Sequence, residues 1–186
     1  MNIGEDLVEM SESFSFPFDA AGYMHDYVMT TASVAEAKED PILLGSVLEE
    51  NAGDGYYLTT DKLGSWFHQK CSKSVDRVSK DGHAYTFSEG PVVFPDPWDR
   101  PGRTIVTSEG QLNRPTHVVA DPGNGRLRVL TPVETERLNG FDDGWTDTGM
   151  PRRKRYFCMG NALVVPMITR MGAVLDSIID AEQQTE

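Results

Sequence analysis

The residue types that perform acid–base, nucleophilic or metal chemistry are scattered along this sequence. His68 and Cys71 are three residues apart at the end of an expected helix. Two such residues are a weak indication of a metal site, and a structural role is favoured for them. Asp96 and Asp99 flank a proline, which favours a turn over an acid–base pair. No GxSxG, P-loop or GxGxxG motif is present, and the four histidines form no HxxxH or HExxH pair. The sequence therefore predicts neither a self-contained catalytic site nor a metal site.

Length and composition are those of an ordinary globular protein. With 186 residues, 39% hydrophobic and 25% charged, the chain is long enough for one domain with an appendage. No apolar run reaches about 18 residues, and the N-terminus lacks the basic and apolar regions of a signal peptide, so we expect neither membrane insertion nor secretion. Cys71 and Cys158 form no CxxC motif, which fits a reducing compartment. We expect a cytoplasmic protein.

The net charge of −12 is unevenly distributed along the chain. Residues 1–99 carry 6 basic and 18 acidic side chains, whereas residues 100–170 carry 11 basic and 7 acidic ones. Because a phosphate backbone responds to local potential, the 100–170 stretch can still meet DNA. Surface ion pairs within the protein explain the same arginines equally well.

The expected elements begin with a polar, acidic N-terminal segment. Its one aromatic stretch, Phe14–Phe18, contains a proline that favours an extended chain. Thr60 can cap a helix that runs to about Lys70. Residues 81–130 alternate glycine and proline with β-rich runs, which predicts a small irregular β region with long loops. The predicted strands are Ala84–Phe87, Val92–Phe94, Arg103–Thr107, Thr116–Val119 and Arg126–Leu130.

Two helices are predicted at the end of the chain. Thr131–Glu134 is a capping box with Pro132 at the first helical position, and Gly140 ends this helix. The last helix is predicted from about Asn161 to about Asp180, with apolar residues at i, i+3, i+4 and i+7 spacing. The stripe consists of Val164, Met167, Ile168, Met171, Val174, Leu175, Ile178 and Ile179. It is wide for a chain with few other helices, so we expect its partner surface to lie outside this chain.

Several stretches resemble the DNA (cytosine-5) methyltransferases, in the order of that family. Residues Arg128–Phe141 resemble the ninth family motif, and Gly160–Pro166 resemble the tenth and last one. Upstream, Arg100–Ile105 is similar to a stretch of the family's target-recognition domain in which a threonine is followed by a hydrophobic residue. Phe16–Pro17 and Pro41–Leu58 are similar to the family's segment after the eighth motif. The resemblance covers most of the chain.

The resemblance implies an α+β fold. A small irregular β-rich target-recognition domain would be followed by C-terminal helices, the last of them docking on an α/β AdoMet-dependent catalytic domain. The expected division is an extended N-terminal segment at 1–40 and a target-recognition domain with the ninth motif at 41–150. Residues 151–186 would carry the tenth motif and the C-terminal helix that packs on the catalytic domain.

The family's Phe-x-Gly-x-Gly, Pro-Cys, Glu-Asn-Val and Arg-rich eighth motifs lie N-terminal to the matched part. Neither cysteine follows a proline here, and Asp142 stands where the family usually has proline. The chain is thus interpreted as the target-recognition part of a methyltransferase that moves a methyl group from AdoMet to C5 of cytosine, as in restriction–modification. It would be inactive alone, with double-stranded DNA and a separate catalytic half as partners. The alternative is a non-catalytic DNA-binding or protein-interaction module.

The family motifs imply where AdoMet would be bordered. Asn161, Ala162 and Leu163 would lie beside its methionine end, and Phe141 would approach it from the ninth-motif turn. Many family members have serine at the position of Ala162, so a hydroxyl contact is lost here. Helix capping and core packing are the alternative roles for these residues.

DNA contacts are implied for the 103–114 stretch. Arg103 and Thr104 would touch phosphate, and a loop would enter the major groove, where Gln, Asn and Arg can read base edges. The loop residues are Ser108, Glu109, Gly110, Gln111, Asn113 and Arg114. A polar surface turn is the alternative for this loop. The basic run Arg152–Arg155 fits either phosphate contact or pairing with acidic groups.

Overall fold

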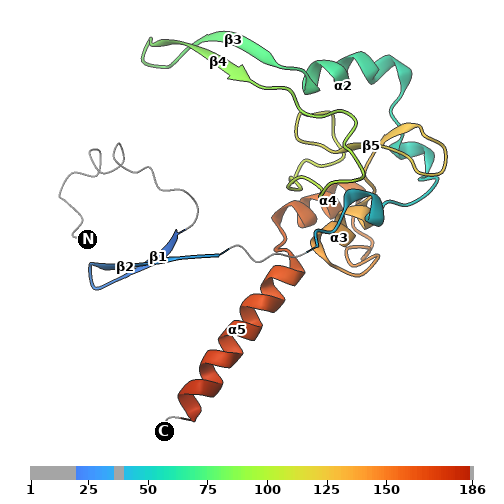
Figure 1. Cartoon of the computed structure of the whole chain (residues 1–186). Coiled ribbons are helices and arrows are strands. Elements are labelled where there is room, and N and C mark those ends of the chain that lie inside the picture. The colour runs from blue at the N-terminus through green and yellow to red at the C-terminus, as the bar shows by residue number, and fades with distance from the viewer. Residues whose placement is uncertain (1–19, 36–39, 185–186) are drawn as a thin grey trace. The chain divides into compact units, whose positions relative to one another are not determined.

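The computed structural model describes residues 20–35 and 40–184 (Figure 1). The chain divides into two compact units, Met1–Asp40 and Pro41–Glu186. In the first unit, β1 (Ala20–His25) pairs antiparallel with β2 (Val28–Ser33). Asp26 and Tyr27 form the turn with φ of 49° and 61°, a conformation that matches the twist of hairpin strands. The sequence predicted an extended segment at 1–40 and did not predict this hairpin, and the predicted Phe14–Phe18 segment lies outside the described residues.

The second unit mixes helices with small two-stranded antiparallel sheets, which confirms the predicted α+β class. β3 pairs with β4, and β5 pairs with β6. Its elements are the 3₁₀ helices η1 (Leu44–Val47), η2 (Asp54–Tyr56) and η3 (Thr60–Lys62), α2 (Leu63–Lys70), β3 (Lys73–Val78), β4 (Ala84–Glu89), β5 (Val118–Ala120), β6 (Leu127–Val129), α3 (Pro132–Asn139), α4 (Arg152–Asn161) and α5 (Val165–Gln183). The predicted division of the chain into three parts stays a prediction.

The predicted strands are confirmed only in part. β4, β5 and β6 lie within or across predicted runs, whereas Val92–Phe94 and Arg103–Thr107 form no strand. Prolines flank the first run, and Pro101 and Gly102 precede the second, so neither has a stretch of backbone free to build a ladder. β3 was missed, because four of its six residues are polar and they do not alternate with apolar ones.

Two apolar clusters form the core of this unit, and β5 lies between them. Val118 packs with Trp66 and Val129 in one cluster. Val119 packs in the other cluster, whose buried members also include Leu44, Val47 and Leu130. Because successive residues of a strand point to opposite faces, one short strand serves both clusters. Asp96 is anchored to this strand, because its amide donates to the carbonyl of Val118 at 2.7 Å and its carboxylate accepts from the amide of Val118 at 2.8 Å.

The buried guanidinium of Arg128 joins β6 to α3 and to the segment that follows η1. Arg128 has no exposed surface, and its Nε donates to Asp121 at 2.7 Å. Its terminal nitrogens donate to both carboxylate oxygens of Glu134, at 2.8 and 2.6 Å, and to the carbonyl of Glu49 at 2.8 Å. The two carboxylates together with the carbonyl satisfy this buried cation.

Asp121 organises the same region through its carboxylate. Burial alone would raise the pKa of this carboxyl, but hydrogen bonds from Arg128 and from the amides of Asn51, Ala52 and Gly123 hold its pKa below the ordinary value of 3.8. The ionised form is thus the one that the fold stabilises.

This depressed pKa predicts acid sensitivity. Since the folded-state pKa of Asp121 lies below its unfolded-state value of 3.8, its stabilisation is present in full well above pH 3.8 and is lost progressively as the pH falls below 3.8 toward the folded-state pKa. Urea unfolding from pH 7 to pH 3 should show the free energy of unfolding falling below about pH 4. The exposed Asp143, paired with Arg137, serves as the control, because Asp143→Asn should leave this fall in place. Equal stability at pH 3 and pH 7 would contradict the prediction.

Helix α3 begins and ends as the sequence predicted. The Thr131 hydroxyl accepts from the amide of Glu134 at 3.2 Å, and the Glu134 carboxylate accepts from the amide of Thr131 at 2.6 Å, with Pro132 at the helix start. Gly140 ends the helix at φ 80°. The predicted capping box and terminating glycine are confirmed.

The predicted last helix is wrong at its start. α4 ends at Asn161, Ala162–Val164 is extended, and α5 begins at Val165. Pro166 explains the break, because it has no amide hydrogen to donate to the carbonyl four residues back, that of Ala162, and its ring would clash with that carbonyl in a continuous helix. α4 itself, at Arg152–Asn161, was not predicted.

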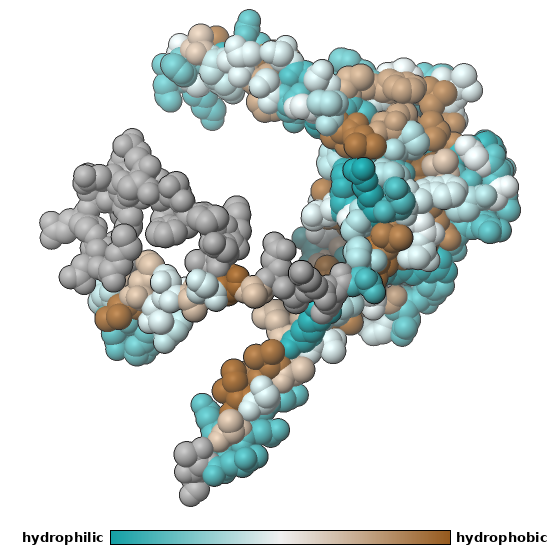
Figure 2. All heavy atoms as spheres, in the orientation of Figure 1, coloured by the Kyte–Doolittle hydropathy of each residue, from teal (hydrophilic) through white to brown (hydrophobic). Residues whose placement is uncertain are grey.

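Helix α5 presents its apolar stripe to solvent (Figure 2). Exposed fractions along the stripe range from 39% at Val164 to 62% at Met171. Among the described residues, Arg152–Gln183 is the one stretch that matches a membrane-crossing helix in length and composition. An apolar helix that packs on another protein meets the same criteria, and a stripe confined to one face is typical of such packing.

Candidate functional site

Arg103 holds the segment predicted to contact DNA, residues 103–114, through hydrogen bonds within the protein. Its Nε and Nη2 donate to the two carboxylate oxygens of Asp96, at 2.7 and 3.1 Å. The guanidinium also donates to the carbonyls of Pro115 and Thr116, at 2.8 and 3.2 Å. Arg103, predicted to touch phosphate, therefore has most of its donors engaged within the protein, while the neighbouring Thr104 is exposed.

Asn113 closes the loop over residues 108–114. Its side-chain nitrogen donates to the carbonyl and the hydroxyl of Ser108, both at 3.0 Å. Its side-chain oxygen accepts from the amide and hydroxyl of Thr116, at 2.9 and 2.7 Å. An asparagine amide can make about four hydrogen bonds. All four are made to Ser108 and Thr116, so Asn113 shapes the loop, whereas the sequence predicted that it reads a base.

Glu109 is also turned into the protein, with only 1% of its surface exposed. Its carboxylate accepts from the amide of His117 at 2.7 Å and faces the Nδ1 of the same residue at 3.2 Å. The Nε2 of His117 is a buried polar atom for which the described residues provide no hydrogen-bond partner. Glu109 was predicted to enter the major groove, and its burial places the carboxylate out of reach of a groove.

Arg114 was predicted to read a base, and the structure turns it toward the ends of the β3–β4 hairpin. It donates to the carbonyls of Gln69 and Cys71, at 3.2 and 2.9 Å, and to the carbonyl of Gly90. Its Nε lies 3.7 Å from the Glu89 carboxylate, and its side chain is 18% exposed. The predicted DNA-reading residue thus holds two segments of the protein together.

Lys70, which the sequence did not single out, completes this arrangement. It is 2% exposed, and its ammonium donates to the carbonyls of Arg114, at 2.9 Å, and Thr116. Burial, with the positive charge of Arg103 nearby, lowers the pKa of Lys70 to about 8. A lysine at a helix end normally extends into solvent, so no signal in the sequence marked its burial.

The tip of the loop remains accessible. Gln111 is exposed, and Gly110 adopts φ 75° where the loop passes α4. A Cβ on Gly110 would lie 2.5 Å from the ring of Tyr156, which is buried and donates to the carbonyl of Leu130. Of the residues predicted to meet DNA, the structure leaves Thr104 and Gln111 most open to a ligand.

The tenth-motif glycine lies against the chain just before this loop. A Cβ on Gly160 would lie 2.3 Å from the amide nitrogen of Thr107 and 2.4 Å from the carbonyl carbon of Val106. The C-terminal end of α4 and the predicted DNA-contacting segment are therefore in backbone contact, which only glycine permits.

The structure brings the two predicted cofactor-binding segments together. The side chain of Asn139 donates to the carbonyl of Met159 at 2.9 Å, and a Cβ on Gly140 would meet Pro166 at 2.6 Å. The end of α3 and the end of α4 thus meet at one junction. Phe141 follows α3 there, and the 161–163 segment lies at the end of α4. Leu163 is 67% exposed.

Further contacts around this junction show how the turn after α3 is held. The Phe141 ring lies 5.5 Å from that of Trp145. The buried Glu136 accepts from the amides of Gly144 and Thr146, at 2.7 and 3.0 Å, and from Arg155 at 2.9 Å. Arg155, in the basic run, is therefore paired with an acidic group of this chain.

Comparison with known proteins agrees with these motifs. Residues 25–177 match the family model of C-5 cytosine-specific DNA methylases. The chain therefore belongs to this family, as its ninth- and tenth-motif residues predicted. Over 177 residues it is 44% identical to the Type II methyltransferase M.Sau3AI of Staphylococcus aureus.

That match covers 95% of this chain and 42% of M.Sau3AI, so the chain spans about two fifths of its relative. Among solved structures, the methyltransferase EhMeth of Entamoeba histolytica is similar at 18% identity and a TM-score of 0.49, over 81% of this chain and 48% of that one.

Proposed function

We propose that this chain is the target-recognition part of a DNA cytosine-5 methyltransferase and that it acts together with a catalytic half. The observation that carries the proposal is the junction between α3 and α4, where both family motifs meet beside the loop over residues 108–114. A protein built in this way couples DNA contact to the place where the methyl donor would lie.

The chain's own residues would hold DNA and position the reaction. Thr104 would contact phosphate and Gln111 a base edge, since both are exposed on the segment that Arg103 holds. The target base would be turned out of the duplex toward the catalytic half. That half would supply the activated thiol and the protonated carboxyl that the chemistry requires.

AdoMet would supply the methyl group when bound. The residues present fit one wall of its site, because Phe141 and Leu163 offer apolar surface on two segments that the fold joins. Asn161 is exposed and donates to the carbonyl of Phe157 at 2.9 Å, which fixes the end of α4. The remainder of the pocket would come from the catalytic half.

Helix α5 would dock on that half through its apolar stripe. The stripe is exposed along its whole described length. Burying it in an interface would stabilise the complex by about 25 cal/mol for each Å² of apolar surface removed from water. A non-catalytic DNA-binding or protein-interaction module is the alternative, favoured by the same exposed stripe.

The test is transfer of a labelled methyl group from AdoMet to cytosine-containing DNA. One sample contains the chain alone, and the other contains M.Sau3AI with its matched region replaced by this chain. Transfer by the fused protein only is the expected result. Transfer by the chain alone would refute the need for a catalytic half, and a folded, inactive fused protein would favour the non-catalytic alternative.

Two variants of the fused protein test the docking of α5. Met171→Glu places a charge in the stripe and should abolish transfer, whereas Ala173→Glu places the same charge on the opposite side of the helix and should not. Equal activity of the two variants would overturn the docking proposal.

A further inference from the structure

The β3–β4 hairpin has no role in the function proposed so far. β3 pairs with β4 in register from Lys73 opposite Glu89 to Val78 opposite Ala84. In Figure 1 it extends away from α2, to which its first strand is connected. An isolated two-stranded hairpin is only marginally stable in water, so a surface of this kind gains stability from a binding partner.

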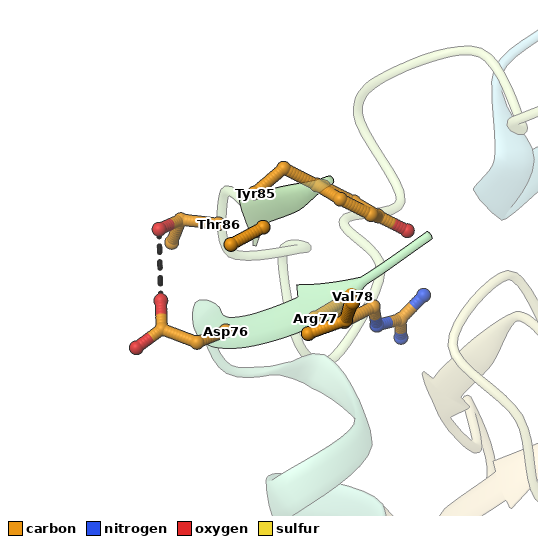
Figure 3. Close-up of a pocket in the computed structure, with 6 residues that line it drawn as sticks. Asp76, Arg77, Val78, Tyr85 and Thr86 are labelled. Atoms are coloured by element: carbon orange, nitrogen blue, oxygen red, sulfur yellow. Dashed lines mark hydrogen bonds between the residues drawn. The ribbon is translucent and has the colours of Figure 1, made fainter. Parts of the chain in front are cut away.

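The hairpin has two chemically different faces, because successive strand residues alternate. The cationic face consists of Lys73, Val75, Arg77, Tyr85, Phe87 and Glu89, and the opposite face of Ser74, Asp76, Val78, Ala84, Thr86 and Ser88. Figure 3 shows Arg77 and Tyr85 extending to one side and Asp76 and Thr86 to the other. With Val78 and Ala84, these residues line a hollow of about 240 Å³. Asp76 accepts from the hydroxyl of Thr86 at 2.8 Å, so this carboxylate is held on the face away from Arg77.

The cationic face combines positive charge with aromatic surface. The guanidinium of Arg77 lies 4.0 Å from the ring centre of Phe87, an arrangement that keeps it flat and limits its rotation. Val75 and Tyr85 are 48% and 43% exposed beside it. The carboxylate on this face, that of Glu89, lies 3.7 Å from Arg114, so its charge is compensated within the protein. An exposed, oriented guanidinium on a β-ribbon is complementary to a phosphate backbone.

The hairpin is tied to the predicted DNA-contacting loop through Arg114. This side chain donates to the carbonyls of Cys71, just before β3, and Gly90, just after β4. A further backbone hydrogen bond joins Val92 to Lys70 at 2.8 Å, at the same base. The two ends of the hairpin are therefore held next to the 108–114 loop, and a DNA duplex bound at this loop would lie near the hairpin.

We propose that the cationic face of the β3–β4 hairpin is a second DNA-binding surface, which contacts the phosphate backbone next to the recognised bases. Arg77 is its main phosphate contact and Lys73 a supporting one, and Arg114 is the positioning residue that couples the hairpin to the loop. The inference rests on the proposed DNA-binding function.

The experiment measures binding of the full chain to labelled duplex DNA over a series of salt concentrations. Arg77→Ala should weaken binding about fivefold to tenfold on every sequence and reduce the slope of log affinity against log salt by about 1. Arg77→Lys keeps the charge without the planar stacking and should recover part of the loss.

Arg126→Ala is the matched control. Its guanidinium also lies 4.0 Å from an aromatic ring centre, that of Tyr57, and its side chain is 58% exposed, but its ion-pair partner is Asp54, which is not part of the hairpin. This variant should bind DNA like the parent chain. Equal losses for Arg77→Ala and Arg126→Ala would overturn the assignment of the hairpin.

Crosslinking locates the surface directly. In a chain whose free cysteines Cys71 and Cys158 are replaced by serine, a photoreactive label on Val75→Cys should crosslink to DNA, whereas the same label on the adjacent Ser74→Cys, on the opposite face, should not. Unchanged affinity and salt slope in Arg77→Ala, with methyl transfer reduced in the fused protein, would assign the face to the catalytic half and overturn the proposal. If the parent chain binds no DNA, the proposed function itself fails, an outcome distinct from DNA binding that is insensitive to Arg77.

Discussion

Replacing Arg128 with alanine is expected to lower the free energy of unfolding by about 3–5 kcal/mol. The reason is that Asp121 and Glu134, which have no exposed side-chain surface, would remain buried as unpaired carboxylates. The carbonyl of Glu49 would also lose its donor at 2.8 Å. Urea unfolding monitored by tryptophan fluorescence measures the effect, and Trp66 in the core is a suitable reporter.

Arg126→Ala again provides the control, two residues away on the same chain segment. Its guanidinium is exposed and lies 3.9 Å from the carboxylate of Asp54, so its removal should cost about 1 kcal/mol or less. If both variants lose equal stability, the buried network does not have the importance assigned to it.

Replacing Gly160 with alanine should produce the second large effect. The new Cβ would lie within 2.5 Å of backbone atoms of Val106 and Thr107, which have no rotamer to change, so α4 or the segment before the 108–114 loop must move. We expect a loss of about 3 kcal/mol in stability. The affinity of the folded variant for DNA should fall as well, because the displaced segment leads into that loop.

Gly64→Ala is the matched control for this change. Gly64 lies in α2, and a Cβ there would meet nothing within 4 Å. Since alanine favours helix over glycine by about 1 kcal/mol, this variant should be neutral or more stable. A Gly160→Ala protein as stable as Gly64→Ala would show that the close approach at α4 is not required.

Local signals predicted the elements that depend on neighbouring residues. The capping box at Thr131–Glu134 and the glycine at 140 were predicted because the helix ends are satisfied by residues within one turn. The apolar stripe of α5 was predicted because its period follows from helix geometry alone. The break before α5 was missed, although Pro166 was present to signal it.

The candidate site was predicted less well than the elements. The loop over residues 108–114 stays a predicted DNA contact, and within it Glu109, Asn113 and Arg114 turn inward. Residue type shows which side chains can hydrogen-bond a base, but only their surroundings decide whether a protein group has already taken those donors and acceptors.

By itself, the sequence determined the family, the α+β class and the order of the motifs, because these depend on residue identity, spacing and local periodicity. The tertiary structure decided which polar side chains are available to a ligand. Lys70 and Arg114 illustrate this, since their hydrogen-bond partners lie 24 to 46 residues away along the chain. Desolvation and long-range hydrogen bonding arise only when the chain is folded, and they turned predicted DNA contacts into the supports of the surface that remains exposed.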